Sequence, residues 1–149
     1  IKRNGSGAYL TENFFQNLGQ AMNGQLMMCV AEESESKKAA AALFFFDKDT
    51  LYGRYWGCLH EYDFLHFELC YYQGIEFAIK HGLSRFDAGA QGEHKIKRGF
   101  EPIETYSLHW IDHPSFSSAI QNFLNQETAH IKEYICQSCE LLPYKSTNK

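Results

Sequence analysis

The chain has 149 residues, of which 44% are hydrophobic and 15% aromatic, and its formal net charge is −4. This length and composition fit one globular domain with a hydrophobic core and exclude a disordered chain. The acidic balance argues against a general nucleic-acid surface, and no apolar run approaches the roughly 20 residues that a membrane-spanning helix needs. No secretory signal is visible, so we expect a cytoplasmic protein.

Apolar spacing predicts a helix over Thr11–Met22, which Thr11 can cap. Three strand-like segments follow, separated by the polar turns Glu33–Lys38 and Asp47–Thr50. The predicted strands are Gln25–Glu32, Ala39–Phe46 and Leu51–Leu59. Because the connections are short and polar, these strands should form an antiparallel meander.

The pattern then changes to a helical period. From Phe67 to Ile79, apolar or small residues recur every three or four positions, and Gly82 is placed to end this helix in a left-handed cap. The next segment, Ser84–Ala88, reads as a strand. A right-handed crossover would make it parallel to Leu51–Leu59. Ligands of such sheets bind where the crossover begins.

After a polar loop and a short basic helix, Glu104–Ile111 is predicted to be a fifth strand and Pro114 to open a long final helix. The apolar positions of that helix predict a buried face made of Phe116, Ile120, Phe123, Leu124, Ile131, Tyr134 and Ile135. Residues 143–149 form a polar tail. The element order predicts an α/β fold with a mixed, mostly antiparallel sheet and helices on both faces.

The loop that follows the fourth predicted strand concentrates glycines and charged side chains. Glycines allow close approach of the backbone to a ligand, and basic side chains can hold a phosphate or carboxylate. Neither a Walker loop nor a G-x-G-x-x-G motif is present. The alternative is a solvated loop that leads into a short basic helix. The polar and glycine positions are Asp87, Gly89, Gln91, Gly92, Glu93, His94, Lys95, Lys97, Arg98 and Gly99.

His66 and Glu68 begin the crossover helix beside the expected ligand site. A helix N-terminus favours the neutral imidazole, so His66 can act as a base with Glu68 as its acid/base partner. The alternative is simple helix capping by acidic residues of the first turn. Cys70 lies one turn beyond His66, but the helical pattern places it on the core face rather than in a nucleophilic pair.

The end of the third predicted strand offers Arg54 as an anion contact or as an arginine stacked on aromatic rings. Strict alternation sends Tyr52, Arg54 and Trp56 to one face and Tyr55 to the other. The connecting loop adds further candidates for substrate contact, His60, Glu61, Tyr62 and Asp63.

The cysteines are odd in number and lie in apolar surroundings, which predicts reduced, buried thiols rather than disulfides. They are Cys29, Cys58, Cys70, Cys136 and Cys139. The C-x-x-C pair has no second ligand pair, so no metal site is predicted.

The run Leu51–Pro102 resembles a bacterial family described as FemAB-like, or peptidoglycan biosynthesis/recognition proteins, within the wider GNAT-type acyltransferase fold. The rest of the chain follows in element order. The resemblance is carried by the stretches GRYWG, HFE, DAGAQGEHK and RGF, at Gly53–Gly57, His66–Glu68, Asp87–Lys95 and Arg98–Phe100.

The likeness extends to Fem-type aminoacyltransferases, which are built of two GNAT-like halves. It implies that residues 1–149 are a single GNAT-like domain, the C-terminal half of a longer protein. The chain starts at Ile1 rather than at methionine, and we expect a missing N-terminal half as its partner. The resemblance implies an acyl-CoA or aminoacyl-tRNA donor and a peptidoglycan-precursor or small-molecule acceptor. Cys58–Gln73 lacks the glycine-rich loop that holds coenzyme A in ordinary acetyltransferases, so that usual mode of binding is not expected.

We therefore predict acyl or aminoacyl transfer to an amine, with catalytic roles for His66, Glu68 and Lys97. Substrate contacts are predicted for Arg54, Trp56, Asp87, Gln91, His94, Lys95, Arg98, Gly99 and Phe100. The second hypothesis is a non-catalytic recognition module with an acyltransferase-like fold. A third is RNA binding through the basic cluster, with a tRNA that carries the donor as the RNA.

Overall fold

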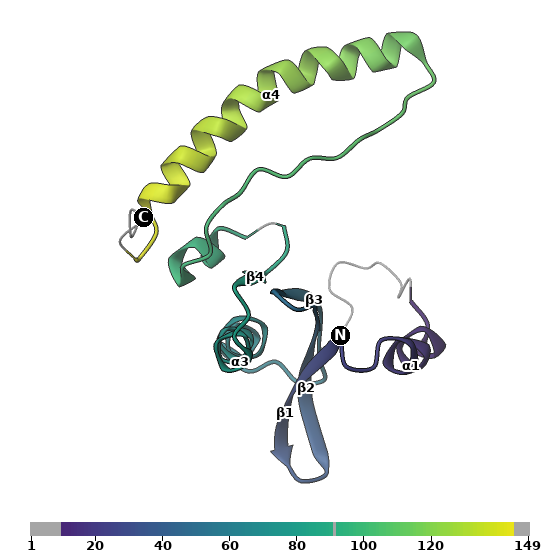
Figure 1. Ribbon diagram of the computed structural model, residues 1–149, viewed down its shortest axis with the longest axis vertical. Helices are drawn as coiled ribbons and strands as arrows, with labels where there is room; N and C mark the ends of the chain where they lie inside the picture. The colour runs from purple at the N-terminus through teal and green to yellow at the C-terminus, as the bar shows by residue number, and fades with distance from the viewer. Residues whose placement is uncertain (1–9, 91, 145–149) are drawn as a thin grey trace. The chain divides into compact units, whose positions relative to one another are not determined.

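A computed structural model describes residues 10–90 and 92–144 (Figure 1). The chain divides into two compact units, Ile1–Ala90 and Gln91–Lys149, and each is described by itself. Whether the chain is one domain, as its sequence predicts, stays a prediction. The polar tail predicted at 143–149 lies outside the described residues from 145 onward.

The first unit contains a four-stranded mixed sheet in the order β1-β2-β3-β4. Its strands are β1 (Leu26–Ser34), β2 (Lys37–Phe46), β3 (Thr50–Cys58) and β4 (Arg85–Asp87). The first three pair antiparallel, and β3 pairs parallel to β4. The predicted meander and the predicted parallel crossover are both confirmed.

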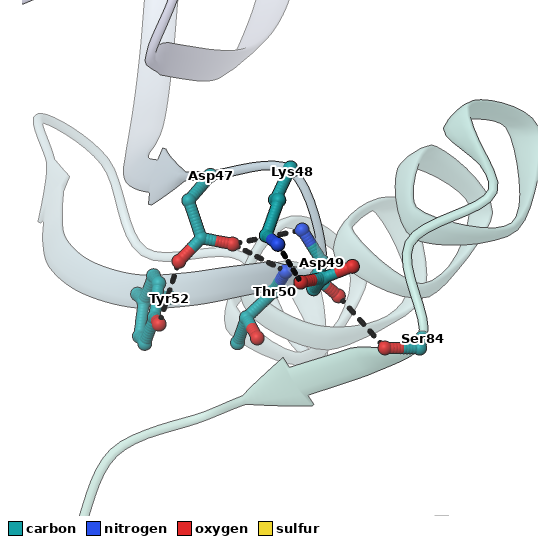
Figure 2. Close-up of polar contacts among 6 residues, drawn as sticks. All are labelled: Asp47, Lys48, Asp49, Thr50, Tyr52 and Ser84. Carbon is teal, nitrogen blue, oxygen red and sulfur yellow. Dashed lines mark hydrogen bonds and ion pairs between the residues drawn. The ribbon is translucent and has the colours of Figure 1, made fainter.

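The turn between β2 and β3 is fixed by one carboxylate (Figure 2). Asp47 Oδ1 accepts hydrogen bonds from the backbone N–H groups of Asp49 and Thr50, each at 2.8 Å, and its Oδ2 accepts from the hydroxyl of Tyr52 at 3.0 Å. The carbonyl of Asp49 accepts from the N–H and the hydroxyl of Ser84 at 2.8 and 3.2 Å. The turn therefore ties the start of β3 to the chain that begins β4.

The helices of this unit begin and end near the predicted positions. Helix α1 (Glu12–Ala21) is capped by Thr11, whose side chain accepts from the N–H of Phe14. The crossover consists of α2 (Leu65–Phe67), the π-helical turn η2 (Glu68–Tyr72) and α3 (Gln73–His81). It ends at Gly82 with φ of 66°, which confirms the predicted left-handed cap. The π turn is not predicted by the helical period.

The core of the sheet lies under the crossover. Small residues at Ala40 and Ala42 let the crossover approach β2, and Phe44 of β2 and Leu51 of β3 are fully buried beneath it. On the opposite face, Phe15 of α1 packs edge-on against Tyr55 of β3, with ring centroids 5.6 Å apart. Figure 1 shows α1 and α3 on opposite sides of the sheet, as predicted.

The second unit contains the 3-10 helix η3 (Glu93–Arg98) and the long helix α4 (Pro114–Glu140). Pro114 occupies the first turn, and the ring of His113 accepts the cap hydrogen bond from Phe116. The short basic helix and the proline start are confirmed.

Two expectations about this unit are wrong. Glu104–Ile111 is not a strand, because β structure needs a paired neighbour and none accompanies this segment within the described residues. Its alternating apolar side chains are 84% to 100% exposed. The face of α4 predicted to be buried is largely exposed as well, and only Ile120 and Ile135 are half-buried.

The cysteines are free thiols, and three of them are half-buried in the first unit. Cys136 and Cys139 lie on exposed positions of α4, which corrects the expectation of burial. Within that part, no helix is long and apolar enough to cross a bilayer.

Candidate functional site

The parallel strands β3 and β4 separate early. Their ladder pairs Thr50–Tyr52 with Arg85–Asp87 only, and β3 then continues to Cys58. After β4 the chain turns away, because Gly89 has φ of 81° and donates its N–H to Asp87 Oδ1 at 2.7 Å. The backbone at Gly53 stays close to this turn, since a Cβ there would lie 3.7 Å from the Asp87 carbonyl oxygen. Asp87 is thus the residue that shapes this turn.

A β-bulge changes the sheet face on which the side chains of the second half of β3 lie. Leu43 of β2 opposes Tyr55 while Phe44 opposes Gly53, so Arg54 is the extra residue. Trp56 consequently packs on the core under the crossover, whereas Tyr52 and Tyr55 lie on the opposite face. The alternation predicted for this strand is wrong, because the bulge shifts its register by one residue.

The guanidinium of Arg54 lies over the Tyr55 ring, 5.1 Å from its centroid. Both side chains therefore belong to the α1 side of the sheet. The structure does not bring Arg54 together with Trp56, its predicted neighbour at the substrate. The stacked position is one of the two alternatives predicted for this arginine.

His66 stands half-buried among aromatic rings at the start of the crossover. Its ring meets Trp56 edge-on at 5.3 Å and Tyr71 edge-on at 5.5 Å between centroids. Phe67 packs beside it, and stacks in turn on Tyr71. Three rings, one each from β3, α2 and η2, therefore fix the orientation of the imidazole.

Glu68 interacts with Cys29 of β1 and with Gln73 of α3. The pKa of the Cys29 thiol on β1 is raised by burial and then by the Glu68 carboxylate, which places this carboxylate near β1. Glu68 also accepts a hydrogen bond from the side chain of Gln73 at 2.9 Å. The pairing of His66 with Glu68 as acid/base partners stays a prediction.

Two features of this region escaped the sequence reading. Phe64, which precedes α2, has φ of 65°, a left-handed conformation that is uncommon outside glycine. Tyr71 completes the aromatic cluster around His66. The four-residue spacing from Phe67 to Tyr71 could have predicted the cluster, whereas no residue pattern predicts the turn at Phe64.

In the second unit, the predicted basic residues gather on η3. Burial and the nearby Arg98 and Lys95 cations lower the pKa of His94 below its ordinary value. Arg98 Nη1 donates to the His94 carbonyl at 2.7 Å, which fixes the arginine along the helix. Lys97 is exposed. The positive field of this cluster suits an anion.

The end of η3 is held by a glycine. Gly99 has φ of 87° and donates its N–H to the Ile96 carbonyl, while the N–H of Phe100 donates to the Lys95 carbonyl at 3.2 Å. The ring of Tyr144 covers Gly99 so closely that a Cβ would lie 2.4 Å from it. Gln91, also predicted to contact substrate, lies outside the described residues.

The predicted site residues thus form two groups. His66 and Trp56 meet in the first unit, which also holds Glu68, Arg54 and Asp87. The second group is the basic helix of the second unit, with His94, Lys95, Lys97, Arg98, Gly99 and Phe100. No group of three or more His, Cys, Asp or Glu residues that could hold a metal ion is found in residues 10–90 and 92–144.

Comparison with known proteins identifies a family. Residues 1–146 match the model of a family named FemAB-like, which is described by the words peptidoglycan biosynthesis/recognition. No curated protein and no solved structure matches the chain.

Proposed function

The chain belongs to the FemAB-like family, and on this premise we propose that it transfers an acyl or aminoacyl group to an amine of a peptidoglycan precursor. The observation that carries the proposal is the family match over residues 1–146 of 149. We also propose a GNAT-type fold. The antiparallel meander that runs into a parallel β3–helix–β4 crossover supports it.

The separation of β3 from β4 supports a site for an extended chain. Beyond Tyr52, β3 runs on to Cys58 without a ladder to β4. The carboxyl ends of neighbouring parallel strands, at the start of a crossover, are where ligands of such sheets bind. An extended acyl donor or stem peptide can add to a strand edge through backbone hydrogen bonds.

The proposed reaction needs a proton acceptor. The acceptor amine attacks the carbonyl carbon of the donor, a C–N bond forms, and the bond from that carbon to the thiol sulfur or ribose oxygen breaks. The amine loses one proton and the leaving group gains one, so the reaction balances without an oxidant or a metal. His66 is the proposed carrier of this proton, either directly or through water. Its fixed orientation against Trp56 and Tyr71 supports that role.

The basic helix η3 is the proposed anion site. Lys95, Lys97 and Arg98 would hold phosphates of the donor, and Lys97 is the exposed one of the three. The lowered pKa of His94 favours its neutral ring, so the positive charge of the helix comes from these three side chains. Both acyl-CoA and aminoacyl-tRNA carry such phosphates, and both are proposed donors. An N-terminal half is the proposed partner.

A transfer assay with the full chain tests these roles. The protein is mixed in turn with acyl-CoA and with aminoacyl-tRNA, in the presence of a lipid-linked precursor that has a free amine, and products are measured by mass spectrometry. We expect H66A and K97A to lower the rate on the order of 100-fold, the size of one acid–base or electrostatic contribution. The matched controls are H130A on α4 and K48A in the β2–β3 turn, both exposed residues whose loss should leave the rate unchanged.

A second function has its own supporting observation. The imidazole of His66 is packed edge-on against two rings, as in a structural aromatic cluster, and this favours a recognition module without turnover. Such a module would bind a peptidoglycan precursor and form no product. Detection of any transferred acyl group would eliminate it.

A further inference from the structure

The loop between β3 and α2, residues 59–64, determines where His66 lies. Its first residues are held by β2, because the N–H groups of Leu59 and His60 donate to the Ala39 carbonyl at 2.7 and 3.4 Å. Its last turn is closed by the N–H of Leu65, which donates to the carbonyl of Tyr62 at 3.3 Å. The path of the loop between these anchors depends on side chains.

One side-chain contact joins this loop to the tip of the β1–β2 hairpin. The hydroxyl of Tyr62 is hydrogen bonded to the carboxylate of Glu33 on β1. Lys37 at the start of β2 forms an ion pair with the same carboxylate. Lys37, and then Tyr62, lower the pKa of Glu33, so the acceptor is charged at neutral pH. A charged acceptor makes the hydrogen bond stronger than a neutral pair.

The backbone at Phe64, close to this contact, is strained. Phe64 is left-handed, a conformation that is strained for a residue with a Cβ and persists only where the surroundings hold it. The carbonyl of Phe64 accepts from the N–H groups of Phe67 and Glu68 at 2.9 and 3.1 Å, and so starts the crossover helix. Phe64 lies two residues after Tyr62 and two before His66.

We propose that Glu33 and Tyr62 are positioning residues for His66. Their contact holds the loop so that Phe64 stays left-handed and the helix starts with the His66 ring against Trp56. The importance of this position for catalysis rests on the proposed function, but the position itself can be measured without any substrate. On the side of Tyr62, the contact depends on a single hydroxyl group, and this side chain is exposed.

The test is the nuclear magnetic resonance signal of the His66 ring in the full chain. The carbon-bound ring protons feel the ring currents of Trp56 and Tyr71, and H66Q identifies their signals. We expect Y62F to move these signals toward the values of an unstructured histidine. E33A should do the same, whereas E33Q should retain most of the shift because its amide oxygen still accepts from Tyr62.

The matched control is Y52F. It removes a hydroxyl from another exposed tyrosine, which donates to a carboxylate at the opposite end of β3, that of Asp47 (Figure 2). Unchanged His66 signals in Y62F, or an equal displacement in Y52F, would overturn the proposal. In a transfer assay Y62F should lower kcat on the order of tenfold while KM stays the same. Displaced signals together with no transfer by the parent chain would refute the proposed function alone.

Discussion

Replacing Gly74 with alanine should destabilise the first unit, although alanine is the better helix former. Gly74 lies in α3 and is buried against β2 and β4. A Cβ at this position would lie 2.6 Å from Cε1 and from Cζ of Phe86, and 3.3 Å from Cε1 of Phe44. Ordinary carbon contacts are about 3.5 to 4.0 Å, so α3 or the Phe86 ring must move by about 1 Å.

The magnitude follows from two opposing terms. Alanine in place of glycine in a helix stabilises by about 0.5 to 1 kcal/mol. Insertion of a methyl group into a packed core costs about 1 to 3 kcal/mol. Because Phe44 is only 1% exposed and cannot move toward solvent, we expect the upper part of that range and a net loss of about 1 to 2 kcal/mol in the free energy of unfolding.

Urea unfolding followed by circular dichroism measures this change. The matched control is G19A in α1, where a Cβ meets nothing within 4 Å, and this variant should gain stability by about 0.5 to 1 kcal/mol. In an F86L background, which removes the ring atoms nearest Gly74, the cost of G74A should shrink. If G74A stabilised the protein as much as G19A, the close packing of α3 on Phe86 would be refuted.

Three further predictions use other features of the chain. Hydrogen bonds from backbone N–H groups lower the pKa of Asp47 in the folded protein. The charged carboxylate therefore stabilises the fold at pH values above the ordinary pKa of about 3.9, and this stabilisation is lost as the pH falls through the lower pKa of the folded state. The difference in unfolding free energy between the parent and D47N should therefore shrink from pH 6 to pH 2, and a constant difference would contradict this. G82A should lower the free energy of unfolding by about 1 to 2 kcal/mol, because φ at Gly82 is 66° and an added Cβ would find no atom within 4 Å to pack against. An unchanged midpoint of thermal unfolding would contradict the left-handed cap. Since desolvation, Arg98 and Lys95 lower the pKa of His94, R98Q should raise it in a resonance titration, and a fall would show that the cation does not act on this ring.

Much of the first unit could be predicted from sequence because its signals are local. The turn residues of Asp47–Thr50, the helical period from Phe67 and the glycine at position 82 each specify one element, and the structure confirms these elements. The family could likewise be inferred from the run Leu51–Pro102, and the match over residues 1–146 confirms it.

The predictions that were wrong concern features that depend on neighbouring strands and helices rather than on the local sequence pattern. The bulge at Arg54 shifts the register between β2 and β3, and alternation along one strand cannot reveal a shift of that kind. Glu104–Ile111 has the alternation of a strand, yet a strand also needs a paired edge. The same limit applies to the site. His66 could be selected from its position at the start of a helix, but the packing of its ring depends on Trp56, which a different strand supplies.

The measurement that tests the central claim most directly is the mass of the acceptor. The full chain is incubated with a lipid-linked peptidoglycan precursor and with each donor, and the precursor is then analysed by mass spectrometry. The account predicts that the precursor gains the mass of one acyl or aminoacyl group at its free amine, and that H66A and K97A slow this gain while K48A does not. An unchanged precursor mass in the presence of demonstrated donor and precursor binding would contradict transfer and leave the recognition module as the function.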